Sequence, residues 1–420
     1  MGFASTYLET KVLFPEIIHE APDPETGIIV VIPAYNEPGI CKLLDSLLAC
    51  YEPDCKVEVI IVVNAPADST EESKNNNKTT LNNIESWKKS NSNCFFRLFA
   101  FIANPPGPVE WGVGLARKTG MDEAVRRFNR IEKYDGIILC LDADCLVENN
   151  YFESVCNELL KRKERSACSI YFEHPLSGNE LPEDNYHFIA LYELHLRYYF
   201  QGLAYSGFQY VFHTVGSAIA VKALPYIKAG GMNKRKAGED FYFIQKLVPA
   251  GGYFSLNSTI VYPSPRVSFR VPFGTGASIG KMTEECMSTL YTYNILAFKE
   301  LRAFFLMTER FYNCSPDELP GCYELLPRGL RSFINEKEWT EKIMEIKNNT
   351  SSILSFKKRF FGWFNMFRIV KYLNRVHSGI FEKIPVEISA SELLGNTGIY
   401  FKSKDAIDLL LYYREMEKNS

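Results

Sequence analysis

Two carboxylates stand one residue apart at the end of an apolar run. The segment from Gly136 reads GIILCLDAD and closes on Asp142 and Asp144. In an extended backbone, residues i and i+2 point to the same side, so both carboxylates are expected to project from the carboxyl end of a strand. Two negative charges this close repel unless a cation or a proton lies between them. The pair predicts a site for Mg²⁺ or Mn²⁺ that also receives a diphosphate, and the alternative is an acidic turn.

Apolar runs rich in Val, Ile and Phe recur before this pair, and polar helix-like segments separate them. They cover residues 28–32, 57–63, 95–102 and 137–141. Continuous runs of this kind indicate strands buried on both faces, and hence an α/β fold with a mostly parallel sheet. In such sheets, ligands bind beyond the carboxyl ends of the strands.

Polar side chains stand where these runs end. Asn36 and Glu37 follow the first run, Asn64 follows the second, and Asp142 and Asp144 follow the fourth. Their convergence on one edge of the sheet is therefore expected.

A helical pattern opens at residue 112 and places Arg117 and Lys118 near the same edge. The polar, Asn-rich residues 68–83 are predicted to form a mobile surface loop. From about residue 280, longer helical periodicities and many aromatic residues predict a mainly helical region. The predicted domains are residues 1–280 and 281–420.

The composition limits the class of protein. Of the 420 residues, 46% are hydrophobic and the net charge is −3, which gives no electrostatic argument for a nucleic-acid partner. Eleven cysteines occur without metal-binding spacing, which favours a reducing cytoplasm. The first residues lack the pattern of a secretory signal, and no apolar run is long enough to predict a transmembrane helix.

Five short motifs occur in a fixed order between about residues 25 and 265. They read VVIPAYNE (30–37), GLARKTG (114–120), LDAD (141–144), GSAIAVKAL followed by GGM (216–232), and GEDFYFIQKL (238–247). This order resembles that of family 2 glycosyltransferases with the GT-A fold. The resemblance implies a nucleotide-sugar domain with a mixed, mostly parallel sheet, and transfer of a sugar from a UDP- or GDP-linked donor to a hydroxyl group, with inversion.

The resemblance also implies roles for individual residues. Asp144 would bind the metal, with Asp142 beside it. The donor nucleotide would contact residues from three of the motifs and from the end of the second run: Pro33, Ala34, Tyr35, Asn36, Glu37, Asn64, Arg117, Lys118, Asp142 and Ala143. The family usually carries Asp where Asn64 stands, so this chain lacks one charge there.

The acceptor hydroxyl requires a base, because it is a poor nucleophile at neutral pH. Asp240 is the first candidate and Glu239 the second. Capping of a helix N-terminus is the alternative role for both carboxylates.

One departure from the family concerns a further metal ligand, often His, after the Glu-Asp motif. Residues 262–276 contain no His and carry Arg266 and Arg270 instead. In an extended segment these two arginines face one side and would clamp a diphosphate or an anionic acceptor. A solvated strand edge is the alternative.

Two further patterns have open interpretations. Residues 355–376 hold six basic and seven aromatic residues and no acid, which suits a helix on an anionic membrane or a helix packed on its own domain. His187, His195 and His213 lie in an aromatic-rich segment that either lines an acceptor pocket or belongs to the core. A peripheral location on the inner face of the membrane would fit a lipid-linked acceptor; a glycan, as in polysaccharide biosynthesis, or a small molecule is the alternative.

Two other functions are compatible with parts of this sequence. Phosphotransferases of the haloacid dehalogenase type also use Asp-x-Asp after a strand, but near the start of the domain and followed by Thr or Val, whereas Cys145 follows here. A degenerate nucleotide-sugar or glycan-binding protein would keep the fold without turnover. Asn64 and the missing His favour it, and the intact acidic motifs oppose it.

Overall fold

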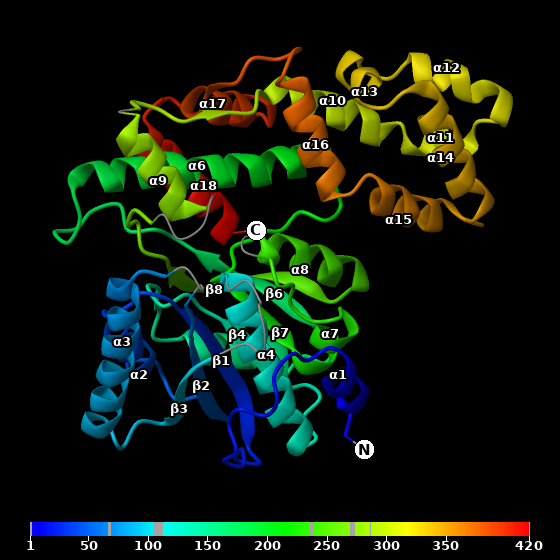
Figure 1. The fold of residues 1–420 in the computed structure, drawn as a ribbon. Coiled ribbons are helices and arrows are strands. Elements are labelled where there is room, and N and C mark those ends of the chain that lie inside the picture. The colour runs from blue at the N-terminus through cyan, green and yellow to red at the C-terminus, as the bar shows by residue number, and fades with distance from the viewer. Residues whose placement is uncertain are drawn as a thin grey trace. The chain divides into compact units, whose positions relative to one another are not determined.

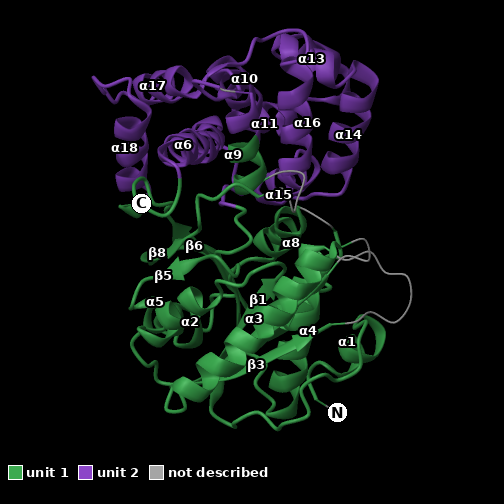
Figure 2. Cartoon of the chain, turned by 60° about the vertical axis from the view of Figure 1, so that its left-hand side comes forward, with its two compact units in different colours: residues 1–181, 214–280, 418–420 green, residues 182–213, 281–417 purple. Residues whose placement is uncertain are grey.

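The computed structural model describes residues 2–65, 69–103, 112–235, 238–268, 274–285 and 287–419. The chain divides into two compact units (Figure 2). Unit 1 comprises residues 1–181, 214–280 and 418–420, and unit 2 comprises residues 182–213 and 281–417. Residues 182–213, which the sequence analysis assigned to the first domain, therefore group with the helical unit.

The described part of unit 1 is built on an eight-stranded sheet (Figure 1). In spatial order the strands are β3 (Phe96–Ile102), β2 (Lys56–Val63), β1 (Thr26–Ala34), β4 (Ile137–Cys140), β7 (Ile219–Lys222), β6 (Ala167–Phe172), β8 (Tyr253–Tyr262) and β5 (Leu146–Val147). Strands β3, β2, β1 and β4 run parallel to one another. Strand β7 is antiparallel to both β4 and β6, while β8 is parallel to β6 and antiparallel to β5. This confirms the predicted α/β class with a mixed, mostly parallel sheet.

The helices of unit 1 follow the strands along the chain. They are α1 (Ser5–Thr10), α2 (Cys41–Leu48), α3 (Glu71–Ser90), α4 (Val113–Arg130), α5 (Tyr151–Val155), the π-helix η1 (Cys156–Leu160), α7 (Ala223–Lys228), α8 (Glu239–Leu247) and the 3₁₀ helix η2 (Val248–Ala250). Helix α4 packs on β1 and β2. A Cβ atom on Gly120 would lie 2.4 Å from Val31 Cγ1, so glycine permits this close packing of helix on sheet.

The prediction of a mobile loop over residues 68–83 was wrong, because α3 begins at Glu71. Thr70 caps the helix by accepting the Ser73 N–H (3.1 Å), and Glu71 and Glu72 stand in the first turn, where the helix dipole favours acids. The buried side chains Asn77, Thr80, Ile84 and Trp87 recur at helical spacing. Composition alone does not reveal this buried face, because three of its five residues (Ser73, Asn77 and Thr80) are polar.

Unit 2 is mainly helical, as predicted for the C-terminal region. Its helices are α6 (Glu183–Ser206), α10 (Ile295–Leu306), α11 (Thr308–Asn313), η3 (Pro316–Glu318), α12 (Leu319–Glu324), α13 (Arg328–Phe333), α14 (Glu336–Asn348), α15 (Ile353–Trp363), α16 (Met366–Val376), α17 (Val386–Asn396) and α18 (Ala406–Lys418), whose last residue is assigned to unit 1. Strands β9 (Tyr291–Thr292) and β10 (Ile384–Pro385) form a small antiparallel pair. Helix α9 (Thr275–Glu284) spans residue 280, where one segment of unit 1 ends. None of the described helices is both long and apolar enough to cross a membrane.

The basic, aromatic segment 355–376 forms parts of two helices rather than one. Helix α15 ends at Trp363, and Asn365 caps α16 by accepting the Arg368 N–H (3.3 Å). Phe356 and Phe360 are fully buried within unit 2. The segment thus uses aromatic side chains to pack on its own unit, and contact with a membrane stays a prediction.

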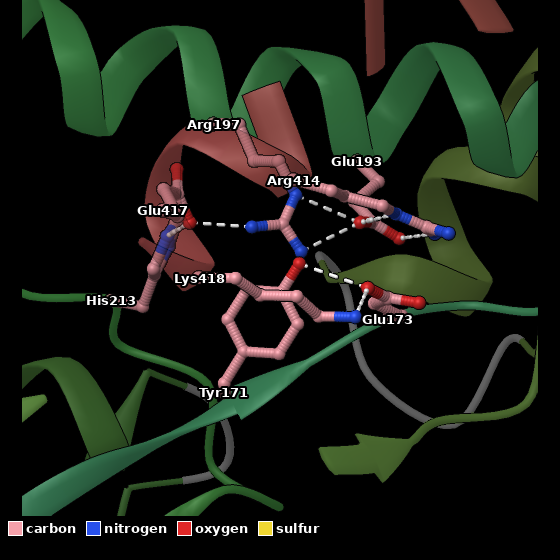
Figure 3. A network of polar contacts seen from close by, with 8 residues as sticks. All are labelled: Tyr171, Glu173, Glu193, Arg197, His213, Arg414, Glu417 and Lys418. Atoms are coloured by element: carbon pink, nitrogen blue, oxygen red, sulfur yellow. Dashed lines mark hydrogen bonds and ion pairs between the residues drawn. The ribbon is translucent and has the colours of Figure 1, made fainter. Parts of the chain in front are cut away.

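A buried ionic network joins the last helix of unit 2 to α6 (Figure 3). Arg414 donates to both carboxylate oxygens of Glu193 (2.8 and 2.7 Å), and Arg197 donates to Glu193 (2.8 Å) and to Glu417. His213 Nε2 lies 2.9 Å from Glu417 Oε2. His213 therefore serves the interior of unit 2, as does His195, whose Nδ1 lies 2.6 Å from Thr292 Oγ1.

Candidate active site

The carboxyl ends of β1, β2 and β4 lie side by side. Strand pairing sets Ala34 opposite Val63, and Val31 opposite Cys140. Beyond the strands, the Asn64 N–H donates to the Ala34 carbonyl (3.0 Å). The segments that follow these three strands are therefore brought to one edge of the sheet.

An asparagine cluster fixes the segment after β1. Asn36 adopts a left-handed backbone conformation with φ 57°, which Asn tolerates better than most residues. Its N–H donates to Asn77 Oδ1 (2.9 Å), and its Oδ1 accepts from Asn76 Nδ2 (2.6 Å). Asn77 Nδ2 also donates to the Asn64 carbonyl (2.9 Å). Helix α3 thus holds the ends of β1 and β2 together.

Arg117 is the centre of the acidic part of the site. Its guanidinium, 2% exposed, donates through Nη1 to Glu239 and through Nη2 to Asp142. A Cβ atom on Gly216 would lie 2.6 Å from Arg117 Nη1, so glycine leaves room for the guanidinium. A Cβ atom on Gly114 would lie 2.3 Å from the Arg235 carbonyl. Four of the predicted motifs therefore meet at this side chain.

The acidic pair lies in a turn rather than in a continuing strand. Strand β4 ends at Cys140, and the Cys145 N–H donates to the Asp142 carbonyl (3.1 Å) to close a β-turn. The extended backbone predicted for Asp142 and Asp144 therefore ends before them. The two carboxylates contact different cations, Asp142 contacting Arg117 and Asp144 contacting Arg266.

Arg266 bridges the segments after β1 and β4. Its Nη2 donates to Glu37, and its Nε lies 2.8 Å from Asp144 Oδ2. Burial lowers the pKa of Arg266, but Asp144 and Glu37 raise it, and the net pKa is raised. The guanidinium is thus held as a cation beside the carboxylate predicted to bind a metal. Arg270 lies outside the described residues.

Carboxyl groups outnumber guanidinium groups in this site. The described side chains place five carboxylates, those of Glu37, Asp142, Asp144, Glu239 and Asp240, around two guanidinium groups, those of Arg117 and Arg266. Burial, opposed by Arg117 and assisted by Asp240, raises the pKa of Glu239 to about 7. Burial also raises the pKa of Asp240.

The carboxylate surplus fits a divalent cation only if substrate oxygens complete its shell. Within the described ranges, no three His, Cys, Asp or Glu side chains are grouped to hold a metal ion. Mg²⁺ is commonly held by one or two carboxylates together with phosphates and water. Asp144 and Asp142 meet that requirement in residue type and in number.

Lys118 points away from the acidic turn. Its Nζ lies 2.8 Å from Asp122 Oδ2 and 3.2 Å from the Tyr7 hydroxyl. Asp122 also accepts from Tyr7 (2.7 Å) and Tyr226 (2.8 Å), so this cluster joins α1 and α7 to α4. Adjacent helical residues differ by about 100° in direction, which explains why Arg117 reaches Asp142 and Lys118 does not.

The remaining predicted donor contacts lie along the same edge. Pro33 and Ala34 are buried in β1, Tyr35 is half-buried just after it, and Ala143 is buried within the acidic turn. Asn76 and Asn77 were not among the predicted site residues, and their only signal was helical spacing within an Asn-rich run. Gly216 was not predicted as the residue that makes room for Arg117.

Comparisons with known proteins show likeness in solved structures only. No protein-family model matches the chain, and no curated protein matches its sequence. Staphylococcus aureus TarS 1–349 in complex with UDP-GlcNAc is 14% identical, with 81% of this chain and 93% of that chain covered and a TM-score of 0.40. Mannosyltransferase PcManGT from Pyrobaculum calidifontis, in complex with GDP-Man and Mn²⁺, is 15% identical over 89% and 91% of the two chains, with a TM-score of 0.38.

A third solved structure is glucosyl-3-phosphoglycerate synthase from Mycobacterium tuberculosis, in complex with Mg²⁺ and UDP. It is 16% identical over 55% of this chain and 69% of that chain, with a TM-score of 0.34. Because all three scores are low, the fold described above rests on the strand order and register of this chain.

Proposed function

We propose that the protein is a glycosyltransferase that moves a sugar from a UDP- or GDP-linked donor to a hydroxyl acceptor in the presence of Mn²⁺ or Mg²⁺. The observation that carries the proposal is the meeting of Arg117, Asp142 and Glu239 beside Asp144 and Arg266, at the carboxyl ends of parallel strands. Ligands of α/β proteins bind at such strand ends. These contacts do not distinguish between a glycan, a lipid-linked sugar and a small molecule as the acceptor.

The nucleoside is assigned to the ends of β1 and β2. Asn36 is fixed there by Asn76 and Asn77, so its backbone is preorganised for a ligand. The side chains of Tyr35 and Asn64 stand on the same two segments. Asn64 offers an amide oxygen and an amide N–H, where a carboxylate would offer only acceptors.

The diphosphate is assigned to Asp144, Asp142 and Arg266. A divalent cation held by Asp144 and Asp142 would offset the charge that grows on the leaving nucleoside diphosphate. Arg266 already lies 2.8 Å from Asp144 and can exchange carboxylate oxygens for phosphate oxygens, which a guanidinium binds with the same fork of donors. Arg117 keeps Asp142 in place through their ion pair.

Asp240 is the better candidate for the base. Glu239 is 2% exposed and its carboxylate is held by Arg117, so it orients Arg117 rather than reaching for a substrate. Asp240 is half-buried, accepts the Phe241 N–H (2.7 Å), and has a raised pKa, which suits proton abstraction nearer to neutral pH. A single displacement assisted by this base would invert the configuration of the sugar.

Thermal unfolding with UDP, GDP, CMP and dTDP, each with and without Mn²⁺, tests the donor site. We expect one nucleoside diphosphate to stabilise the protein only with metal, by about 2.7 kcal/mol at 100 times its Kd. Asp144→Ala should abolish this effect. Glu180→Gln, a change at an exposed carboxylate of unit 1, should preserve it. Absence of any nucleotide response in the wild type would refute the proposal.

Release of nucleoside diphosphate from a panel of nucleotide sugars tests the base. Asp240→Asn should retain nucleotide binding and lose roughly 10²–10⁴-fold in turnover, which is the range for general acid–base catalysis. Full turnover in Asp240→Asn would remove this residue from the role. Metal-dependent nucleotide binding without turnover in the wild type, over the whole panel, would favour the binding-protein alternative.

A further inference from the structure

Arg266 contacts the carboxylate that is predicted to bind the metal. Its Nε lies 2.8 Å from Asp144 Oδ2, and its Nη2 donates to Glu37. Glu37 follows β1 and Asp144 follows β4, the neighbouring strand, so one guanidinium spans carboxylates from two adjacent strand ends. Mg²⁺ and Mn²⁺ also take carboxylate oxygens, so Arg266 and a divalent cation would use the same side chain, Asp144.

The backbone that carries Arg266 is restrained on both sides. Between the end of β8 and Arg266 stand Pro263 and Pro265, both buried, and proline fixes its own φ and keeps the residue before it extended. Beyond Arg266, the Ser268 N–H donates to the Gly276 carbonyl (3.2 Å). The backbone at Arg266 is thus held in place, and its long side chain is the part that can change partners.

The two arginines beside the acidic turn differ in their access to a ligand. The side chain of Arg117 is 2% exposed and is held by both Asp142 and Glu239. The side chains of Arg266 and Asp144 are 29% and 24% exposed, so a ligand in solution can reach them. A guanidinium binds phosphate oxygens with the same fork of donors that it offers to a carboxylate. Arg266, rather than Arg117, is therefore the cation that an incoming diphosphate can draw away from its carboxylate.

We infer that Arg266 makes metal binding depend on the nucleotide, because its guanidinium competes with the divalent cation for Asp144 until the diphosphate of the donor binds Arg266 instead. This dependence rests on the proposed function. It means that the metal and the diphosphate each bind weakly alone and tightly together. Arg266 then acts as a gate for the metal, in the part of the chain where the sequence carries no His to serve as a further ligand.

The cause of the competition is electrostatic. A positive charge held against Asp144 repels a divalent cation on the same carboxylate and offsets the negative charge that would attract it. A diphosphate accepts hydrogen bonds from Arg266 and places negative charge between the guanidinium and the metal, so the repulsion falls. Coupling between two ligands is reciprocal, so the metal must raise the affinity for the diphosphate by the same factor as the diphosphate raises the affinity for the metal.

Binding of Mn²⁺ to the full-length protein, followed by electron paramagnetic resonance of the free ion, measures the competition without turnover. Arg266→Gln should bind Mn²⁺ roughly tenfold more tightly than the wild type, since a unit charge about 4 Å from a divalent ion repels it by at least that factor even at the dielectric constant of water. Adding Asp144→Ala to Arg266→Gln should abolish this gain. Arg266→Lys keeps the charge and should bind Mn²⁺ as the wild type does. Arg162→Gln, which removes a charge from an exposed ion pair with Glu158 (3.2 Å), should also match the wild type.

Calorimetry of UDP and GDP binding, with and without Mn²⁺, measures the coupling. The factor by which Mn²⁺ raises the affinity for the diphosphate should be roughly tenfold larger in the wild type than in Arg266→Gln. An equal factor in both proteins would overturn the dependence on the nucleotide.

The two measurements separate this inference from the proposed function. If neither diphosphate binds, the proposed function fails, while tighter Mn²⁺ binding by Arg266→Gln would still support competition at Asp144. Equal or weaker Mn²⁺ binding by Arg266→Gln, or no Mn²⁺ binding by either protein, would overturn the inference. Equal tightening in Arg266→Lys would do so too, because the charge of residue 266 would then not be the cause.

Discussion

Glu239→Gln should change how the stability of the protein depends on pH. In the folded chain the pKa of Glu239 rises from an ordinary 4.5 to about 7, with burial as the largest cause and Arg117 opposing it. Between these two values the folded state holds a proton that the unfolded state has released. The contribution of Glu239 to the free energy of unfolding therefore falls as the pH rises from about 4.5 to about 7.

The magnitude follows from the size of the shift. At about 1.4 kcal/mol per pKa unit, a rise of roughly two and a half units corresponds to about 3 kcal/mol lost across this interval. Glutamine does not titrate, so Glu239→Gln should lack this loss, although its weaker bond to Arg117 costs some stability at every pH. The difference between the two proteins should therefore shrink, or change sign, as the pH rises.

Urea denaturation of both proteins at a series of pH values from 4.5 to 8 measures this difference, in buffers free of divalent metal and nucleotide. Glu71→Gln serves as a control, since Glu71 is exposed on α3. A constant difference between wild type and Glu239→Gln over the series would mean that Glu239 is ionised throughout. It would refute the conclusion that burial of Glu239 outweighs its ion pair with Arg117.

Three further substitutions test the packing that positions the site and the helical unit. Gly216→Ala places a Cβ atom 2.6 Å from Arg117 Nη1 and should lower the free energy of unfolding by about 1–3 kcal/mol. It should also weaken the binding of nucleoside diphosphate, measured by calorimetry. Gly395→Ala, with open space at its Cβ, should leave this binding unchanged. Asn77→Ala removes bonds to Asn36 and Asn64 and should lower stability by about 1–3 kcal/mol in urea denaturation; an unchanged midpoint would show that α3 does not hold the strand ends. Arg197→Met removes a cation that pairs with Glu193 and Glu417 in the interior of unit 2, and should lower the free energy of unfolding by about 3–5 kcal/mol. Arg331→Met, at the surface, should change it by no more than about 1 kcal/mol. Equal effects of the two substitutions would contradict the importance of burial.

The strands were predictable because burial on both faces leaves a continuous apolar signal. The run 57–63 became β2 (Lys56–Val63), and the run 137–141 became β4 (Ile137–Cys140). Asn64 and Asp142, the polar residues that follow these strands, could be placed at one edge of the sheet because the carboxyl ends of parallel strands lie together. The order of apolar and polar residues along the chain was therefore enough to predict this part of the site.

Contacts made across the sequence were not predictable in the same way. Nothing local to Lys118 shows that Tyr7 and Asp122 surround it, or that its neighbour Arg117 takes the place beside Asp142. The Asn-rich start of α3 lacks an apolar pattern, because its buried face satisfies backbone groups of other segments. The turn at Asp142 is closed by a backbone hydrogen bond from Cys145, and the apolar run before the turn does not predict this bond.

The division of the chain into units has a practical consequence for genetic dissection. The backbone passes from one unit to the other at residues 181/182, 213/214, 280/281 and 417/418, so neither unit is one continuous stretch of sequence. A gene fragment ending at residue 280 would encode α6 without α10 and α17, the helices on which it packs in unit 2. It would expose Leu194 and Tyr198, which are fully buried in the intact chain. Expression of unit 1 alone therefore requires removal of residues 182–213 as well as truncation after residue 280.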